Sequence, residues 1–353
     1  MVGWRVVIAG VVALALSAGS VTAQTENPHG PVVDTIRPLQ TISASDQARI
    51  VDWVRFEVEA LQNTASDSKI EAAKRFGKAF LSQFESPQNT QAFRGQFATQ
   101  AAIVAAEALV NPQADQVVSG ALARVMLDMN RPETVPGFVA GLKCKWEWAR
   151  YLCARGLAAQ QGAIATDKDK LEQVVRALRE AGETETGPVA LEQVYRTLAI
   201  PNQQALVIDA YLSILDRRLA AKKTKPEAWD GAENAAFEYL RVPALLNGLS
   251  APQKSQLVIR LAGFLRLAAE RYAAPNLSFT EIDDLERSLD ATEEMLETLA
   301  GAGGGNIRKV LENQGYAGNK EVLAEAKRWI GDKESTTPGL LNAAPWSIPQ
   351  GAP

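Results

Sequence analysis

Apolar residues recur at helical spacing along most of this chain, and no stretch shows the sustained alternation of apolar and polar residues that is typical of a β-strand. The first apolar stripe consists of Ile50, Val54, Val58 and Leu61. Similar stripes predict helices near 70–84, 91–109, 117–127, 134–142, 146–160, 168–181, 187–199, 202–222, 227–247, 252–273, 278–300 and 319–330. The connections are mostly short, which favours antiparallel neighbours. We therefore expect an all-α fold.

Several helix boundaries carry their own signals. Asp167 stands where a side chain can cap the first turn of the helix at 168–181, and Gly182 is expected to end that helix. Pro188 begins the next helix, at a position where the missing N–H costs least. The lysines at 222–225 lie at the end of the helix at 202–222, where positive charge complements the helix dipole.

The segment 134–157, TVPGFVAGLKCKWEWARYLCARGL, carries the most informative pattern. A Val-Pro pair opens a short apolar helix, a tight turn follows, and Arg150 stands near the start of a second helix that contains small residues. In this order of features the segment resembles a HEAT repeat. It departs from the family pattern in the turn, where Cys144, Lys145 and Trp146 replace the usual Asp and Pro, and at Gly156, where alanine is usual.

The resemblance is clear over about one repeat and looser over residues 65–220. It implies a right-handed α-solenoid, a superhelix of antiparallel helix pairs in which each pair buries its apolar face by stacking on the next. An irregular helical bundle is the alternative fold.

The two ends of the chain differ in composition from the middle. Residues 1–23 have the form of an export signal, with Arg5 before a hydrophobic run that is shorter than the roughly 20 residues of a membrane-spanning helix. Cleavage after Ala23 would leave no membrane span and would place the protein in the periplasm or outside the cell. We further expect a flexible leader at 24–45, a helical repeat domain at 46–330 with a sub-boundary near 200, and a disordered tail at 331–353.

Composition restricts the chemistry more than the fold. The chain has one histidine and two cysteines, so a histidine-based triad, a histidine-rich metal site and a disulfide framework are not expected. The formal net charge of −4 argues against nucleic acid as a partner. No catalytic residue, cofactor or metal ligand is assigned.

A mixed basic and aromatic cluster is the best candidate for a binding surface. Its six residues follow or flank the turn of the HEAT-like segment: Lys143, Lys145, Trp146, Trp148, Arg150 and Tyr151. Aromatic and arginine side chains dominate the energetics of protein interfaces. The alternative is that one tryptophan packs inside and the charges are solvated.

The two cysteines, Cys144 and Cys153, are nine positions apart in this segment. Along one helix that separation is about 13 Å, whereas a disulfide needs Cα atoms within about 7 Å. A bond between them would require a sharp reversal of the chain at Lys145. The simpler expectation is a buried thiol at Cys153 and a thiol in the turn at Cys144.

Two other motifs have weaker functional interpretations. The helix at 278–300 carries eight acidic residues between 281 and 297, which could act as acid and base or could form a solvated face. The glycine-rich stretch at 301–306 lacks the lysine of a phosphate-binding loop and is expected to be a flexible joint.

These patterns predict an exported, non-enzymatic scaffold that binds other proteins through a helical array. Two alternatives stay open: a carboxylate-dependent hydrolase or lyase that acts on an extracellular polymer, and a carrier of a small ligand. The hydrolase would need acids and aromatic residues in one cleft, and their separation along the chain neither provides nor excludes that arrangement.

Overall fold

The computed structural model describes residues 27–226, 229–300, 305–332, 338–343 and 346. Within these ranges the chain consists of helices and turns, without a strand, so the all-α fold is confirmed. The first ten α-helices are α1 (Gly30–Ile36), α2 (Ala44–Gln62), α3 (Lys69–Glu85), α4 (Gln91–Leu109), α5 (Gln116–Met129), α6 (Val135–Gly141), α7 (Glu147–Ala159), α8 (Gln161–Ala165), α9 (Lys168–Thr184) and α10 (Pro188–Leu198).

The remaining α-helices are α11 (Gln204–Thr224), α12 (Asn234–Leu240), α13 (Pro243–Gly248), α14 (Ala251–Tyr272), α15 (Phe279–Ala300), α16 (Ile307–Gln314) and α17 (Asn319–Ile330). Short 3-10 turns occur at Pro132–Thr134, Gly315–Gly318 and Leu340–Asn342. No helix in the described part of the chain is long and apolar enough to cross a membrane.

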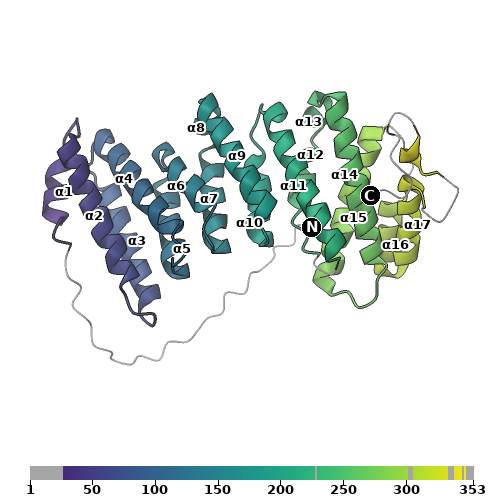
Figure 1. The fold of residues 1–353 in the computed structure, drawn as a ribbon, viewed down its shortest axis with the longest axis horizontal. Helices are drawn as coiled ribbons and strands as arrows, with labels where there is room; N and C mark the ends of the chain where they lie inside the picture. The colour runs from purple at the N-terminus through teal and green to yellow at the C-terminus, as the bar shows by residue number, and fades with distance from the viewer. Residues whose placement is uncertain (1–26, 227–228, 301–304, 333–337, 344–345, 347–353) are drawn as a thin grey trace.

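The helices lie side by side in an elongated row that runs from α1 to α17 (Figure 1). Two successions of contacts run along the row: α2, α4, α6, α9, α11, α14 and α17 pack one on the next, as do α3, α5, α7, α10, α12 and α15. Helices that follow each other in the chain, such as α6 and α7 or α14 and α15, connect the two successions. Each helix therefore packs mainly on helices that are close to it in the sequence.

The core between α2, α3 and α4 is built from aromatic rings. The ring of Trp53 lies 5.0 Å from that of Phe80 and 5.5 Å from that of Phe97, measured between centroids. All three side chains are at most 2% exposed. Each such side chain buries a large apolar area, so this end of the row is stabilised mainly by the hydrophobic effect.

Around α6 and α7 the core is built instead from small residues that allow close approach of helices. A Cβ atom at Gly156 would lie 2.3 Å from the ring of Phe138, and one at Gly141 would lie 2.3 Å from the sulfur of Cys153. Contacts this short are not possible, so glycine is required at both positions. Glycine in the segment 134–157 thus lets α6 and α7 approach each other closely.

Most predicted helix boundaries agree with the structure, and two do not. The Asp167 side chain accepts a hydrogen bond from the Lys170 N–H and caps α9, and Pro188 opens α10. The prediction that Gly182 ends α9 is wrong, because α9 continues to Thr184 and Gly182 is instead the point where the Ile214 side chain contacts the helix. The single helix predicted at 227–247 is two short helices, α12 and α13, and Pro243 begins the second.

The chain ends also differ from expectation where they are described. In the predicted leader at 24–45, residues 30–36 form α1 rather than an extended spacer, and Val33 and Ile36 are buried. In the predicted tail at 331–353, Leu341 is fully buried against the end of α17. A few well-placed apolar side chains are enough to dock these segments on the row. The predicted signal at 1–23 lies outside the described residues.

Candidate functional site

The six residues of the predicted surface lie in the turn between α6 and α7 and in the first turns of α7. After α6, the N–H of Lys143 donates to the Ala140 carbonyl and that of Cys144 to the Gly141 carbonyl, each at 3.0 Å. These bonds reverse the chain tightly. Glu147, the first residue of α7, then accepts hydrogen bonds from the N–H groups of Val189 and Ala190 at the start of α10.

Arg150 connects this turn to the turn between α9 and α10. Its guanidinium donates two hydrogen bonds of 2.6 Å to the carboxylate of Glu185, and a third of 2.8 Å to the Cys144 carbonyl. The Glu185 side chain is 2% exposed and also accepts from the Gly187 N–H. The hydrogen bonds from Arg150 to Glu185 raise the pKa of the guanidinium. Arg150 is thus committed to holding two helix pairs together.

Lys145 and Trp146 connect the same turn to the preceding pair. The Lys145 ammonium donates to the Pro112 carbonyl, and the Trp146 indole N–H donates to the Ala114 carbonyl, both at 2.8 Å. The ammonium also lies 5.0 Å from the centre of the Trp146 ring. Both side chains are therefore engaged by the turn between α4 and α5.

Trp148 is the exposed aromatic residue of the cluster, and the half-buried Tyr151 packs against it. Their rings stack at 5.0 Å with an interplanar angle of 17°. Trp148 is 52% exposed, and its indole also covers Gly120 on α5, where a Cβ atom would lie 3.3 Å from Cδ1. Contact on two sides holds an exposed aromatic ring in a defined position on α7.

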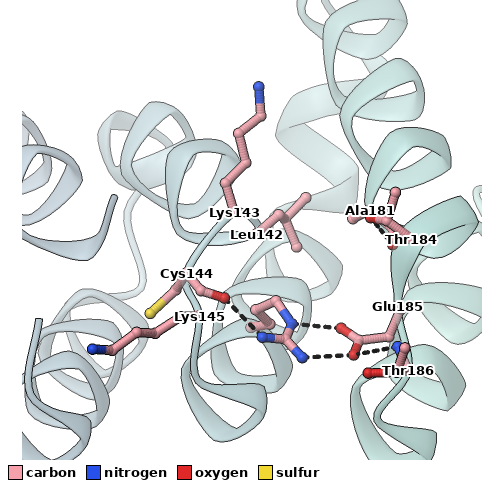
Figure 2. Close-up of a pocket in the computed structure, with 9 residues that line it drawn as sticks. Leu142, Lys143, Cys144, Lys145, Ala181, Thr184, Glu185 and Thr186 are labelled. Carbon is pink, nitrogen blue, oxygen red and sulfur yellow. Dashed lines mark hydrogen bonds and ion pairs between the residues drawn. The ribbon is translucent and has the colours of Figure 1, made fainter. Parts of the chain in front are cut away.

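A pocket of about 280 Å³ lies beside the turn, with Lys143, Lys145 and Arg150 among its lining residues. The two lysine side chains point away from Glu185 and in different directions (Figure 2). The Lys143 ammonium lies 4.0 Å from a carboxylate oxygen of Glu180. The pocket brings three of the predicted residues together, but their charged groups do not converge on one point. The described residues therefore do not form an anion-binding site there.

Both cysteines are free and buried. Burial raises the pKa of the Cys153 thiol, and the nearby Cys144 adds to the effect. Cys153 therefore stays protonated and behaves as a small apolar side chain. No group of three or more His, Cys, Asp or Glu side chains in the described part of the chain is placed to hold a metal ion.

The acidic helix α15 uses its central carboxylate for structure. Glu293 is 3% exposed and accepts hydrogen bonds from the N–H groups of Ile307 and Arg308, which open α16. The Trp329 indole N–H also donates to it, at 3.3 Å. The predicted solvated face is therefore wrong at Glu293. Other acids of α15 pair with neighbours: Glu281 with Arg271, Glu286 with Tyr272, and Asp290 with Arg308.

The acids of α15 and the aromatic residues of α7 are not brought into one cleft. α15 packs on α12, α14 and α16, whereas α7 packs on α5, α6 and α10. The two helices lie apart along the row (Figure 1). The predicted glycine joint at 301–306 lies mostly outside the described residues.

A second charged cluster, which the sequence did not reveal, joins α11 to the segment before α12. The Arg218 guanidinium donates to both carboxylate oxygens of Asp230 at 2.7 Å and to Glu233. The Lys222 ammonium lies 3.3 Å from Glu233 Oε2 and 4.2 Å from the centre of the Trp229 ring. Lys222 and Glu233 are 2% and 0% exposed. Four charged groups are thus wholly or largely buried in one place.

Comparisons of the chain with protein-family models, curated proteins and solved structures found no match. The HEAT resemblance of 134–157 therefore stays a prediction. Function has to be inferred from the geometry of the molecule itself.

Proposed function

We propose that the chain is an exported, non-enzymatic protein-binding module whose helix pairs form a right-handed α-solenoid of the HEAT type. The two successions of packed helices support this architecture, because each helix contacts the equivalent helix of the next pair. A long row with local contacts offers an extended surface rather than one deep catalytic pocket. Export is proposed from the sequence of residues 1–23. Mass spectrometry of the intact protein tests it, because the measured mass should be that of a chain that begins at Gln24.

The stacked pair Trp148 and Tyr151 is the observation that carries the proposal. Most apolar side chains of this size are buried in the described core, whereas Trp148 is held in place and half exposed. A fixed aromatic ring loses little entropy on binding, and tryptophan and tyrosine are the residues most often found at the energetic centre of interfaces. The other cluster residues that reach neighbouring turns fix α7 in the row.

The charge beside the aromatic pair indicates the partner. Arg155 is exposed one turn beyond Tyr151 on α7, at a spacing that places it on the same helix face. Lys143 and Lys145 are exposed in the turn at the other end. We infer a protein segment with an apolar or aromatic anchor flanked by Asp or Glu residues.

Selection of random 12-residue peptides on the mature chain tests this inference. Peptides that carry an aromatic or leucine anchor next to acidic residues should be enriched. Their affinity should fall by about tenfold or more in Trp148→Ala, the loss expected for an interface hot spot. Phe279→Ala is the matched control, since Phe279 is 92% exposed on a different helix and its loss should leave affinity unchanged.

Two outcomes would contradict the proposal: enriched peptides without acidic residues, or equal affinity for the wild type and Trp148→Ala. Urea unfolding of both variants shows whether they remain folded. Because Trp148 is a surface residue, its replacement should lower the free energy of unfolding by about 1 kcal/mol or less.

The hydrolase alternative is not supported by the arrangement of the acids. Glu293, at the centre of the acidic helix, caps α16. The aromatic pair on α7 packs with a different set of helices. The carrier alternative has one supporting observation, a pocket beside α11.

A further inference from the structure

A pocket of about 470 Å³ opens beside the end of α11. Its described lining residues are Thr186, Arg218, Ala221, Lys222, Thr224, Lys225 and Asp230. Thr186 belongs to the turn between α9 and α10, so the pocket lies between two helix pairs. Its volume is in the range of natural small-molecule sites.

Unsatisfied polar groups gather near Lys222, one of the lining residues. The described part of the chain has eight buried side-chain atoms without a hydrogen-bond partner, and four of them belong to Tyr195, Lys222, Trp229 and Glu233. Glu233 and Arg218 lie close enough to Tyr195 to act on its pKa. Buried polar groups are normally hydrogen-bonded, so such a concentration indicates a place where a bound molecule or water completes the bonding.

The ammonium group of Lys222 is the central unsatisfied donor. Lys222 is a lining residue that is 2% exposed, and its ammonium forms ion pairs of 3.3 and 3.7 Å with Glu233 and Asp230 without a hydrogen bond. The Trp229 ring lies 4.2 Å from the ammonium. The ammonium is therefore a buried donor at the wall of the pocket that lacks an acceptor in hydrogen-bond geometry.

The charge of the lining selects the kind of acceptor. Arg218, Lys222 and Lys225 oppose the single carboxylate of Asp230 in the wall. Glu233, buried behind the first two cations, reduces the balance to one positive charge. One positive charge matches a monoanion better than a doubly charged phosphate.

The rest of the wall is aliphatic. Ala221, Thr186 and Thr224 line the same space as the lysines, and most of the exposed lining surface is apolar. We propose that this pocket binds a small aliphatic carboxylic acid, with the carboxylate at Lys222 and Lys225 and the hydrocarbon chain against Ala221. This inference is independent of the surface on α7.

Hexanoate is a suitable probe, because it combines one carboxylate with a short aliphatic chain. Titration into the mature chain should shift the amide resonances of Thr186, Ala221 and Lys225, with a dissociation constant on the order of 1 mM for a ligand of this size. Hexanol has nearly the same body without the charge and should bind at least tenfold more weakly. Inorganic phosphate should also bind more weakly than hexanoate.

Lys225→Met tests the site without disturbing the buried charges, because Lys225 is exposed. Loss of one charge-assisted contact should weaken hexanoate binding by about threefold to tenfold. Lys223→Met is the matched control, since Lys223 is exposed on the same helix turn but is not a lining residue. It should bind hexanoate as the wild type does.

Four results would overturn the proposal. Equal binding of hexanol and hexanoate would show that the carboxylate is not recognised. Phosphate that binds more tightly than hexanoate would assign the pocket to another anion. An equal effect of the two lysine variants, or amide shifts confined to other regions, would place the binding elsewhere.

Discussion

The turn between α6 and α7 and the end of α11 both carry several cations, but the cations have different partners. Near α6 and α7, each cation bonds to a neighbouring turn, Lys145 to a backbone carbonyl and Arg150 to a single carboxylate, Glu185. The helices there pack closely at Gly141 and Gly156. At the end of α11, Arg218 and Lys222 are buried with Glu233.

The stability of the two regions should therefore respond to different kinds of substitution. Close packing through Gly141 and Gly156 should be sensitive to added volume and indifferent to pH, because no charge is involved. The buried charges should tolerate changes of shape better than changes of charge, because each one depends on the others for compensation. Substitutions in each region can test the contrast.

The largest effect is expected for Glu233→Ala. The change removes a fully buried carboxylate and leaves Arg218 and Lys222 with less compensating charge. Breaking a buried ion pair from one side costs about 3–5 kcal/mol, measured as the free energy of unfolding in urea. Glu238→Ala, at an exposed position of α12, should change it by less than about 0.5 kcal/mol.

A loss below about 1 kcal/mol for Glu233→Ala would contradict this picture. It would mean that water compensates the two cations, and that the cluster contributes little to the stability of the region. The double variant Glu233→Ala with Lys222→Met distinguishes the cases, because removal of both charges should recover part of the loss if they are coupled.

Much of the fold was predictable because helix signals are local. The apolar stripes at 91–109 and 319–330 match α4 and α17 at both ends. The cap at Asp167 and the helix start at Pro188 depend on residues within one turn, and both predictions are confirmed. Gly182 shows the limit of such predictions. Its contact is with Ile214, 32 residues further along the chain, and the sequence around Gly182 carries no sign of that contact.

The segments that were missed lack a long apolar stripe. α16 has one buried residue, Ile307, and α1 has two, so neither forms a recognisable period. Proline interrupts the region of α12 and α13, where the expected single helix is wrong. In each case the element exists because a neighbouring helix covers it.

The structure places the six residues of the candidate surface in one turn and at the start of α7, but the contact that each side chain makes was not predictable. Lys145 and Trp146 donate hydrogen bonds to the backbone carbonyls of Pro112 and Ala114 in another turn. Every residue has such a carbonyl, so the sequence does not show which one will accept. The cluster at Arg218 had one local signal, the two cations Arg218 and Lys222, which lie four positions apart on one face of α11. Its acids follow 12 and 15 residues after Arg218, beyond the helix end.

Gly141→Ala should have the next largest effect, because the added methyl group meets the Cys153 sulfur. Overpacking of this kind costs about 1–3 kcal/mol in unfolding free energy. Cys153→Ala in the same chain should relieve the clash. The double variant should therefore lose about 1 kcal/mol less unfolding free energy than the two single losses added together.

Gly77→Ala provides the matched control for this substitution. Gly77 lies in α3, and nothing lies within 4 Å of the place its Cβ would take. Alanine there should stabilise the protein by roughly 0.5–1 kcal/mol through higher helix propensity. If Gly141→Ala behaved like Gly77→Ala, the close approach of α6 and α7 would be refuted.

The smallest effect is expected in the acid range and concerns Asp230. Burial alone raises the pKa of this carboxyl, but Lys222 and Arg218 act in the opposite direction and the net pKa is lowered from its usual 3.8. A lowered pKa in the folded state means that the unfolded chain takes up the proton first as pH falls. The contribution of Asp230 is therefore complete above about pH 4 and is lost as pH falls through the lower pKa of the folded state.

Asp230→Asn should accordingly be less stable than the wild type at pH 6. The gap, which is the difference in unfolding free energy between the two proteins, should narrow as pH falls below about 4. Urea unfolding at several pH values between 6 and 3 measures this gap. Its size at pH 6 should be below that of Glu233→Ala, since Asp230 is 23% exposed and Arg218 keeps its bond to Glu233. A gap that stays constant or widens in acid would show that Asp230 is not stabilised by its two cations, and the contrast between α11 and the α6–α7 turn would then rest on Glu233 alone.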